Sequence, residues 1–276
     1  MDAVDVGWAR RALPGFFSPL EVVASVPTTM ARAAELAAAG EPEGATVVAE
    51  EQTEGRGRLG RAWVAPPGTS LLVSVVLRPP LAREAVWLTV AAAGVALAGA
   101  VDEVAPGAAP AGLKWPNDLE LHGRKAAGLL AEAQLEGDRL AAVLLGMGVN
   151  VTQGAADLPA EVADRATSVS LAAGAPVDRA ALLASWAGRF LTGYQSLCAG
   201  RPGEVLAAYR ERLLTVGRRV RAERVGAGPV VGTAVDLTPT GALVVQTATG
   251  ARVEVTAGDV HHLRDAQVSG PPTPGR

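Results

Sequence analysis

One uncharged segment, from Ala85 to Val101, limits the fold more than any other feature of the chain. Its seventeen residues contain no Asp, Glu, Lys or Arg, and more than half of them are alanine or glycine. A membrane-spanning helix needs about 20 predominantly apolar residues, so this segment falls short of a span. We expect it to form a helix that is buried in the core of a soluble protein.

The composition favours one larger and one smaller domain. The chain has 276 residues, of which 49% are hydrophobic, enough for one sizeable core. Its net charge of −3 gives no general reason to expect a nucleic-acid partner. The single cysteine, Cys198, cannot form an internal disulfide, and three histidines without a cysteine cluster give no ligand set for structural zinc. The first eighteen residues lack the charged-then-apolar order of a signal peptide, so we expect a cytoplasmic protein that does not enter a membrane.

The pattern of apolar residues predicts an α+β fold with a mixed β-sheet backed by helices. A helix is expected to begin at Thr28 or Thr29 as N-cap and to end at Gly40. Strands are expected at residues 21–26, 46–51, 70–77, 126–135 and 140–151. The last two of these strands flank a Glu-Gly-Asp turn and should form a hairpin. Two further helices are expected at residues 178–197 and 204–214.

The residue pattern changes at Gly217. From there on, the sequence consists of short Val-rich runs separated by glycine and proline. About fifty residues of this kind suit a small barrel-like β module. We therefore predict four segments: an N-terminal extension over 1–20, a main domain over 21–215, a small β-barrel domain over 216–264 and a disordered tail over 265–276.

The first chemical motif is the segment 55–61, which reads Gly-Arg-Gly-Arg-Leu-Gly-Arg and is followed by Trp63. Its glycines allow the backbone to approach a ligand closely, and its arginines supply forked donors for carboxylate and phosphate oxygens. Such a loop can close over an anionic nucleotide. A solvated basic turn or a nucleic-acid patch of the arginine-glycine type explains the same residues. The motif is neither a Walker loop nor a dinucleotide fingerprint.

The second motif is Lys114-Trp115-Pro116-Asn117-Asp118, followed by Lys125 and Gly128. Asn117 can read a sugar or base by hydrogen bonds, and Asp118 can hold a cation or orient Lys125. The ammonium group of Lys125 is a compact charge for an acyl or phosphoryl oxygen. Taken alone, the segment also suits a polar hairpin turn with an exposed lysine.

Together the two motifs resemble the biotin protein ligase family. Both of that family's hallmarks are present in its order, with Gln52 ahead of the arginine loop and a Gly-Met-Gly-Val-Asn strand at 146–150. The resemblance runs from about Glu21 to Leu263. It implies the class II synthetase-like catalytic fold of biotin and lipoate ligases over 21–215 and an SH3-like barrel over 216–264.

The resemblance also implies roles for individual residues. The biotin-binding residues would be Thr28, Thr29, Gln52, Gly55, Arg56, Gly57, Lys125 and Gly128. The residues that bind ATP and the adenylate would be Arg58, Arg61, Trp63, Asn117 and Asn150. Lys125, Arg58 and Asp118 would carry the catalysis. Two positions depart from the family: Met30 replaces a common asparagine, and Glu54 stands where a small residue is usual and can pair with a loop arginine.

The activity implied is ATP-dependent formation of biotinyl-5'-AMP, with Mg²⁺ bound mainly through the ATP phosphates. Biotin then passes to a lysine of the biotin carboxyl carrier domain of an acyl-CoA carboxylase. About twenty residues precede the first strand, too few for a winged helix, so we expect no DNA binding. An exposed edge strand can serve either the carrier domain or a second copy of the chain in a homodimer.

Two other functions compete with this interpretation. A lipoate or octanoate ligase shares the fold and the acyl-adenylate chemistry, although the arginine loop is typical of biotin ligases. A non-enzymatic protein that binds nucleic acid through the arginine-glycine loop belongs to another class, and steeply salt-dependent DNA binding would identify it.

Overall fold

The computed structural model describes residues 7–224, 227–256 and 258–263, so the predicted tail at 265–276 lies outside the described residues. The chain divides into two compact units, Met1–Leu213 and Leu214–Arg276. Each unit is considered by itself below.

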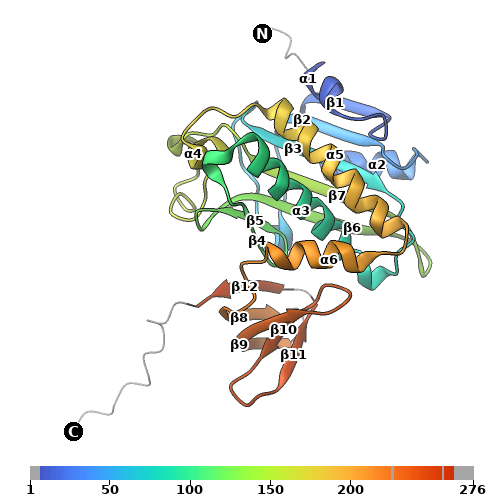
Figure 1. Cartoon of the computed structure of the whole chain (residues 1–276). Coiled ribbons are helices and arrows are strands. Elements are labelled where there is room, and N and C mark those ends of the chain that lie inside the picture. The colour runs from blue at the N-terminus through green and yellow to red at the C-terminus, as the bar shows by residue number, and fades with distance from the viewer. Residues whose placement is uncertain (1–6, 225–226, 257, 264–276) are drawn as a thin grey trace. The chain divides into compact units, whose positions relative to one another are not determined.

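The first unit is built on a seven-stranded sheet with the order β1-β2-β3-β7-β6-β5-β4 (Figure 1). Its strands are β1 (Leu20–Val26), β2 (Thr46–Gln52), β3 (Ser70–Leu77), β4 (Gly112–Lys114), β5 (Asp118–Leu121), β6 (Arg124–Glu136) and β7 (Arg139–Asn150). β1 and β2 are parallel, because a helix connects them, and every other pair is antiparallel. The predicted mixed sheet and its long hairpin, β6 with β7, are confirmed.

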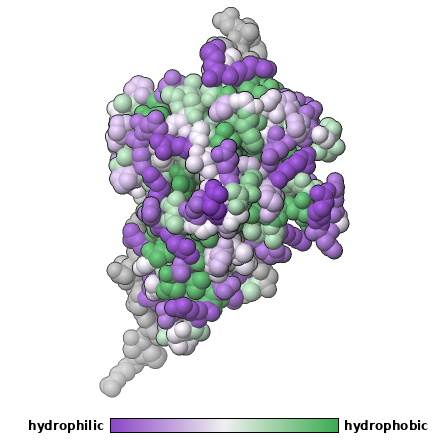
Figure 2. All heavy atoms as spheres, turned by 45° about the vertical axis from the view of Figure 1, so that its right-hand side comes forward, coloured by the Kyte–Doolittle hydropathy of each residue, from purple (hydrophilic) through white to green (hydrophobic). Residues whose placement is uncertain are grey.

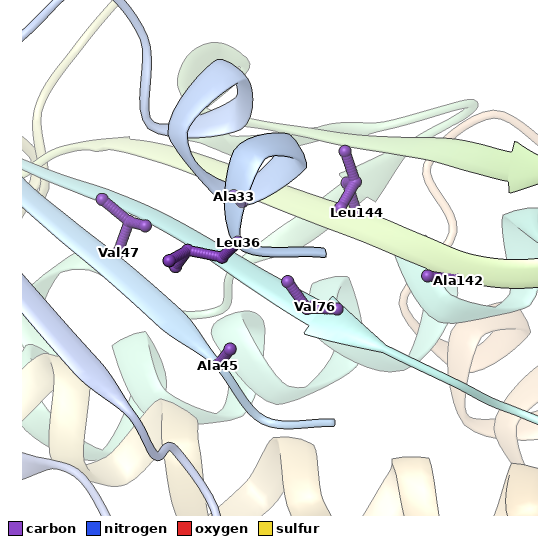
Figure 3. Packing of buried hydrophobic residues seen from close by; sticks show 7 residues of the cluster. All are labelled: Ala33, Leu36, Ala45, Val47, Val76, Ala142 and Leu144. Carbon is purple, nitrogen blue, oxygen red and sulfur yellow. The ribbon is translucent and has the colours of Figure 1, made fainter. Parts of the chain in front are cut away.

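Helices cover both faces of this sheet. They are α1 (Gly7–Ala12), α2 (Thr29–Ala38), α3 (Trp87–Val104), α4 (Val169–Ala173), α5 (Arg179–Cys198) and α6 (Pro202–Glu211). α2 packs on one face, where Leu36 points toward Val47, Val76 and Leu144 of three neighbouring strands (Figure 3). α3 and α5 lie side by side on the opposite face. The predicted arrangement of a sheet backed by helices is therefore present.

α3 is the apolar segment from which the sequence analysis began. Among the described residues it belongs to the one helical stretch, Arg83–Val104, that is long and apolar enough to cross a membrane. Of its most apolar window, 78% is buried inside the protein, so α3 is a core helix, as predicted. The face of the molecule in Figure 2 carries hydrophilic and hydrophobic residues mixed together.

The residues before β1 contribute to the core of the first unit. α1 contacts α5 and β1. The buried ring of Phe17 lies 5.9 Å from the ring of Trp186, which stacks on Phe190 at 5.1 Å. Part of the stretch predicted as an N-terminal extension is thus packed against α5 through aromatic contacts.

The second unit is a five-stranded antiparallel sheet with the order β11-β10-β9-β8-β12. Its strands are β8 (Arg219–Arg224), β9 (Ala227–Leu237), β10 (Leu243–Gln246), β11 (Arg252–Val255) and β12 (Gly258–His262). Buried residues on several strands, including Val220, Ala234 and Val245, form its apolar interior. The predicted small C-terminal β domain is confirmed.

The burial of α3 predicts a large loss of stability when its core side chains are shortened. Leu97 is fully buried in α3. We expect Leu97→Ala to lower the free energy of unfolding by about 2–5 kcal/mol, because it removes buried methyl groups and leaves a cavity. Urea denaturation followed by circular dichroism measures this change.

The matched control is Leu171→Ala, because Leu171 is 42% exposed in α4. We expect this control to change the free energy by about 0.5 kcal/mol or less. Equal effects of the two substitutions would contradict a buried position for α3.

Candidate active site

Thr29 is the first residue of α2, just after β1 ends, and its polar groups contact β2 and β3. Oε1 of Gln52 accepts hydrogen bonds from the backbone N–H (2.7 Å) and the hydroxyl (3.1 Å) of Thr29. The Ser74 hydroxyl in β3 donates to the Thr29 hydroxyl at 2.8 Å. Thr28 caps α2, since its hydroxyl accepts from the Ala31 N–H at 2.9 Å. The structure thus brings Thr28, Thr29 and Gln52 together as neutral donors and acceptors.

Met30 places an apolar side chain beside this polar cluster. A Cβ added at Gly146 would lie only 2.7 Å from Sδ of Met30, so the thioether crosses β7 at Gly146. Gly146 pairs in register with Ser74, the neighbour of Thr29. Met30, which departs from the asparagine that the resemblance implies, thus supplies an apolar contact here.

The arginine loop leaves β2 and folds back on itself. The Gly57 N–H donates to the Arg61 carbonyl at 2.7 Å, and the Trp63 N–H donates to the Gly55 carbonyl at 2.8 Å. A side chain at Gly55 would collide with the Trp63 carbonyl oxygen, so this position requires glycine. Leu59, at the tip, has left-handed backbone angles, with φ 57° and ψ 32°.

The loop arginines contact two different partners. Nη1 of Arg58 donates to Oδ1 of Asn117 at 3.4 Å, which links the first motif to the second. Nη2 of Arg56 lies 3.6 Å from Oε2 of Glu54, and both side chains are largely exposed. The expectation that Glu54 can pair with a loop arginine is confirmed.

The second motif forms a firmly held turn between β4 and β5. Trp115 is buried, and the Pro116 carbonyl accepts a hydrogen bond from Nε1 of Trp87 in α3 at 2.8 Å. The Asn117 amide donates to the Leu129 carbonyl at 2.7 Å, and the Leu129 N–H donates to the Asn117 carbonyl at 2.9 Å. These contacts fix the backbone of the turn to both α3 and β6.

Lys125 and Asp118 form an ion pair at the start of β6. Nζ of Lys125 lies 2.6 Å from Oδ1 of Asp118, and 36% of the lysine side chain is exposed. The backbone of Lys125 is held on its other side, since its N–H donates to the Arg165 carbonyl at 2.8 Å and its carbonyl accepts from the Thr167 N–H at 2.9 Å. The pairing of lysine and aspartate on adjacent strands agrees with the sequence prediction. The segment 165–167 is not predicted by the sequence, because it holds Lys125 through backbone groups and not through side chains.

Trp63 lies across two glycines that face each other on neighbouring strands. Gly128 of β6 pairs in register with Gly148 of β7. A Cβ would lie 3.3 Å from the Trp63 ring at Gly128 and 2.8 Å from it at Gly148. Nζ of Lys125 is 5.9 Å from the centre of the same ring. Because the two glycines have no side chains, the indole packs directly against the backbone of β6 and β7, and the Lys125 ammonium lies beside the ring.

Asn150 is buried at the end of β7 and is bound by the protein itself. Its amide donates to the Thr167 carbonyl at 3.0 Å, and its Oδ1 accepts from Nε2 of Gln153 at 3.2 Å. Gln153 also donates to the Ser70 hydroxyl at 2.6 Å. This network places Asn150 next to the segment that holds Lys125.

Tyr209 of α6 lies behind the second motif. Burial, together with the charge of Asp118, raises the pKa of the Tyr209 hydroxyl well above its usual value. Its ring packs edge-on against Trp87 at 5.0 Å.

The residues that the structure describes contain no group of three or more His, Cys, Asp or Glu side chains able to hold a metal ion.

Lysine usage is a further signal in the composition of the chain. The chain has 25 lysines and arginines, and Lys114 and Lys125 are its only two lysines. Lys114 is paired with Glu120 at 3.3 Å, and Lys125 with Asp118. In a chain that otherwise uses arginine for every basic side chain, two lysines in one motif indicate positions where a compact ammonium group is needed.

Two known protein families match this chain. The Biotin/lipoate A/B protein ligase family matches residues 22–150, and the Biotin protein ligase C terminal domain matches residues 215–263. The biotin--[acetyl-CoA-carboxylase] ligase of Mycobacterium tuberculosis is 40% identical over 250 residues, which cover 89% of each chain. The chain belongs to the biotin protein ligase family. The bifunctional ligase/repressor BirA of Bacillus subtilis is 34% identical over 81% of this ligase and 68% of its own length.

Solved structures of biotin protein ligases share the fold. The enzyme from Aquifex aeolicus in complex with biotin and ATP has a TM-score of 0.76 and 28% identity, covering 90% of this ligase and 100% of that chain. The enzyme from Leishmania major in complex with biotinyl-5-AMP has a TM-score of 0.56 and 26% identity, covering 87% and 99%. The class II synthetase-like catalytic fold and the SH3-like C-terminal domain are thereby supported for this ligase.

Because the Trp63 ring packs directly against Gly128 and Gly148, a methyl group added at Gly148 should displace the ring. We expect Gly148→Ala to move the Trp63 ring into water, because the new Cβ would lie 2.8 Å from the indole. Tryptophan emission should then shift to longer wavelength and become more accessible to acrylamide.

Two controls isolate this effect among the five tryptophans. The shift should disappear when Gly148→Ala is made in a Trp63→Phe background. Gly188→Ala, at a helical position with nothing within 4 Å of the added atom, should leave the emission unchanged. An unchanged spectrum in Gly148→Ala would contradict the placement of Trp63.

Proposed function

We propose that this ligase condenses biotin with ATP to biotinyl-5'-AMP and transfers the biotinyl group to a lysine of a carrier protein. One observation carries the proposal: Arg58 of the first motif reaches Asn117 of the second at 3.4 Å, so two segments far apart in sequence form one cationic site. Lys125 and Trp63 lie within the same group of residues. A cationic site next to neutral hydrogen-bonding groups suits a ligand with one charged and one uncharged polar end.

The uncharged end of the ligand is assigned to the cluster around α2. Biotin carries a neutral cyclic urea, and Thr28, Thr29 and Gln52 provide neutral donors and acceptors for it. The backbone of Gly55 and Gly57 can approach the same ligand closely, since neither residue has a side chain. Gly128 is also assigned to biotin.

The charged end is assigned to the arginines and Lys125. In the first step a carboxylate oxygen of biotin attacks the α-phosphorus of ATP, and the bond to pyrophosphate breaks. Negative charge develops on phosphate oxygens, where Arg56, Arg58 and Lys125 stabilise it without exchanging protons. Asp118 holds the Lys125 ammonium in place through the 2.6 Å ion pair. Trp63, Asn117, Asn150 and Arg61 are assigned to the nucleotide.

In the second step a neutral lysine amine of the carrier attacks the acyl carbon. The bond from that carbon to the phosphate oxygen breaks, AMP leaves, and the amine loses a proton as the amide forms. The mixed anhydride reacts with water, so a closed arginine loop would protect it until the carrier arrives. The loop therefore has to retain the adenylate and still admit an amine.

The surroundings of the reaction are also part of the proposal. We assign the carrier to the biotin carboxyl carrier domain of an acyl-CoA carboxylase, in the cytoplasm. Mg²⁺ is assigned to the ATP phosphates and enters as part of the substrate, because Mg²⁺ in sites that use ATP is bound largely through substrate phosphates and water. A homodimer formed through an edge strand stays a prediction.

Lys125→Ala should lower the rate of biotinyl-5'-AMP formation by about 100-fold or more, because it removes a charge that stabilises the developing phosphate charge. The product is measured by chromatography in a single turnover without carrier protein. Arg124→Ala is the control, since it removes an exposed cation from the neighbouring position. A normal rate in Lys125→Ala would remove this lysine from the mechanism.

Arg58→Gly should still form the adenylate but release it, because the contact between the loop and Asn117 is lost. Released adenylate biotinylates lysines of an added bystander protein, and streptavidin blotting detects that labelling. Bystander protein is required because the ligase itself has only two lysines. Arg83→Gly serves as the control, because it removes an exposed arginine from the short 3-10 helix between β3 and α3. Equal bystander labelling by wild type and Arg58→Gly would show that this contact does not retain the intermediate.

A further inference from the structure

Two exposed apolar side chains flank the arginine loop. Leu59 is 62% exposed and Val64 is 65% exposed, the highest values among the large hydrophobic side chains that the structure describes. The next most exposed, Leu171, reaches 42%. The two most exposed apolar residues therefore lie within six positions of each other, on the loop between β2 and β3.

The backbone at Leu59 is unfavourable for leucine. Its φ of 57° lies in the left-handed region, and the following Gly60 has a φ of 73°. A residue with a side chain is disfavoured in this conformation, whereas glycine adopts it freely. Leucine at this position is thus both strained and presented to solvent. Strain of this kind is found at binding sites, where the side chain has a use outside its own fold.

The positions of Leu59 and Val64, next to site residues, indicate which partner protein they can contact. Leu59 directly follows Arg58, which reaches Asn117, and Val64 directly follows Trp63, which lies on Gly128. A carrier lysine can attack the adenylate only if the carrier surface comes within a side chain's length of the site. The surface beside that lysine must therefore meet the outer surface of this loop.

We propose that Leu59 and Val64, here called the loop patch, dock the lysine-bearing carrier protein through apolar side chains beside the target lysine. This inference rests on the proposed function. When a partner covers exposed apolar side chains, water is released from their surface and the complex is stabilised. A patch of two residues gives weak, short-lived docking, which suits an enzyme that must release its biotinylated product.

The test separates the two half-reactions in the full-length ligase, with a biotin carboxyl carrier domain as acceptor. Leu59→Gly removes the side chain and suits the observed φ. We expect it to form biotinyl-5'-AMP at a rate within about twofold of wild type. The KM for the carrier domain should rise about 5- to 20-fold, which corresponds to the loss of one buried leucine contact. Hydroxylamine, a small nucleophile that needs no docking, should cleave the adenylate equally fast in both proteins.

Further variants test the chemistry of the contact. Leu59→Asn tolerates the left-handed backbone but is polar, so it should lose carrier binding as Leu59→Gly does. Leu59→Met keeps an apolar side chain and should stay near the wild-type KM. Val64→Ser should raise the KM in the same direction, whereas Leu171→Ser, an exposed apolar residue in α4, should leave it unchanged.

Three results would overturn the inference. The carrier KM of Leu59→Gly could equal that of wild type, or the hydroxylamine reaction could slow as much as carrier biotinylation, which would assign Leu59 to adenylate binding. Gel filtration could show that wild type self-associates through the patch while Leu59→Gly does not, which would assign it to a second copy of the chain. Failure of the proposed function is distinct from all three, since wild type would then form no adenylate from biotin.

Discussion

The pairing of β6 with β7 determines where the part of the candidate site around Trp63 and Lys125 lies. This register sets Gly128 opposite Gly148, and their missing side chains make room for Trp63. β5 is aligned with these glycines as well, because Asp118 pairs with Gly128. The carboxylate of Asp118 then lies 2.6 Å from Nζ of Lys125. A shift by one residue would turn these side chains to the opposite face of the sheet and separate the ion pair.

The sequence predicted the elements of the fold better than their register. Apolar patterning identified five of the seven strands of the main sheet, without the short β4 and β5, and also the buried helix α3 and the β domain at the C-terminal end. The alignment of Gly128 with Gly148 depends on an irregularity between Gln134 and Leu135, and local residue patterns do not encode such pairing. For the same reason, residue patterns do not predict that residues 165–167 hold Lys125, whereas the presence of only two lysines is evident from the composition.

The charges of the site are open to solvent in this structure. The Arg56 side chain is 72% exposed and Lys125 is 36% exposed, so water screens both cations. Closure of the loop over a ligand would remove that water and strengthen the electrostatic attraction between these two cations and the phosphate. Glu54, paired with Arg56 at 3.6 Å, competes with the ligand for the same guanidinium. Tight retention of the adenylate and access for a carrier lysine are thus opposing demands on one loop.

Exchange of labelled pyrophosphate into ATP by the purified wild-type protein tests the central claim most directly, with biotin, lipoate and octanoate supplied in turn. A ligase whose two motifs form one biotin-activating site should exchange label with biotin alone and without any carrier protein. Exchange that depends on lipoate or octanoate instead, or no exchange with any of the three acids, would contradict the claim.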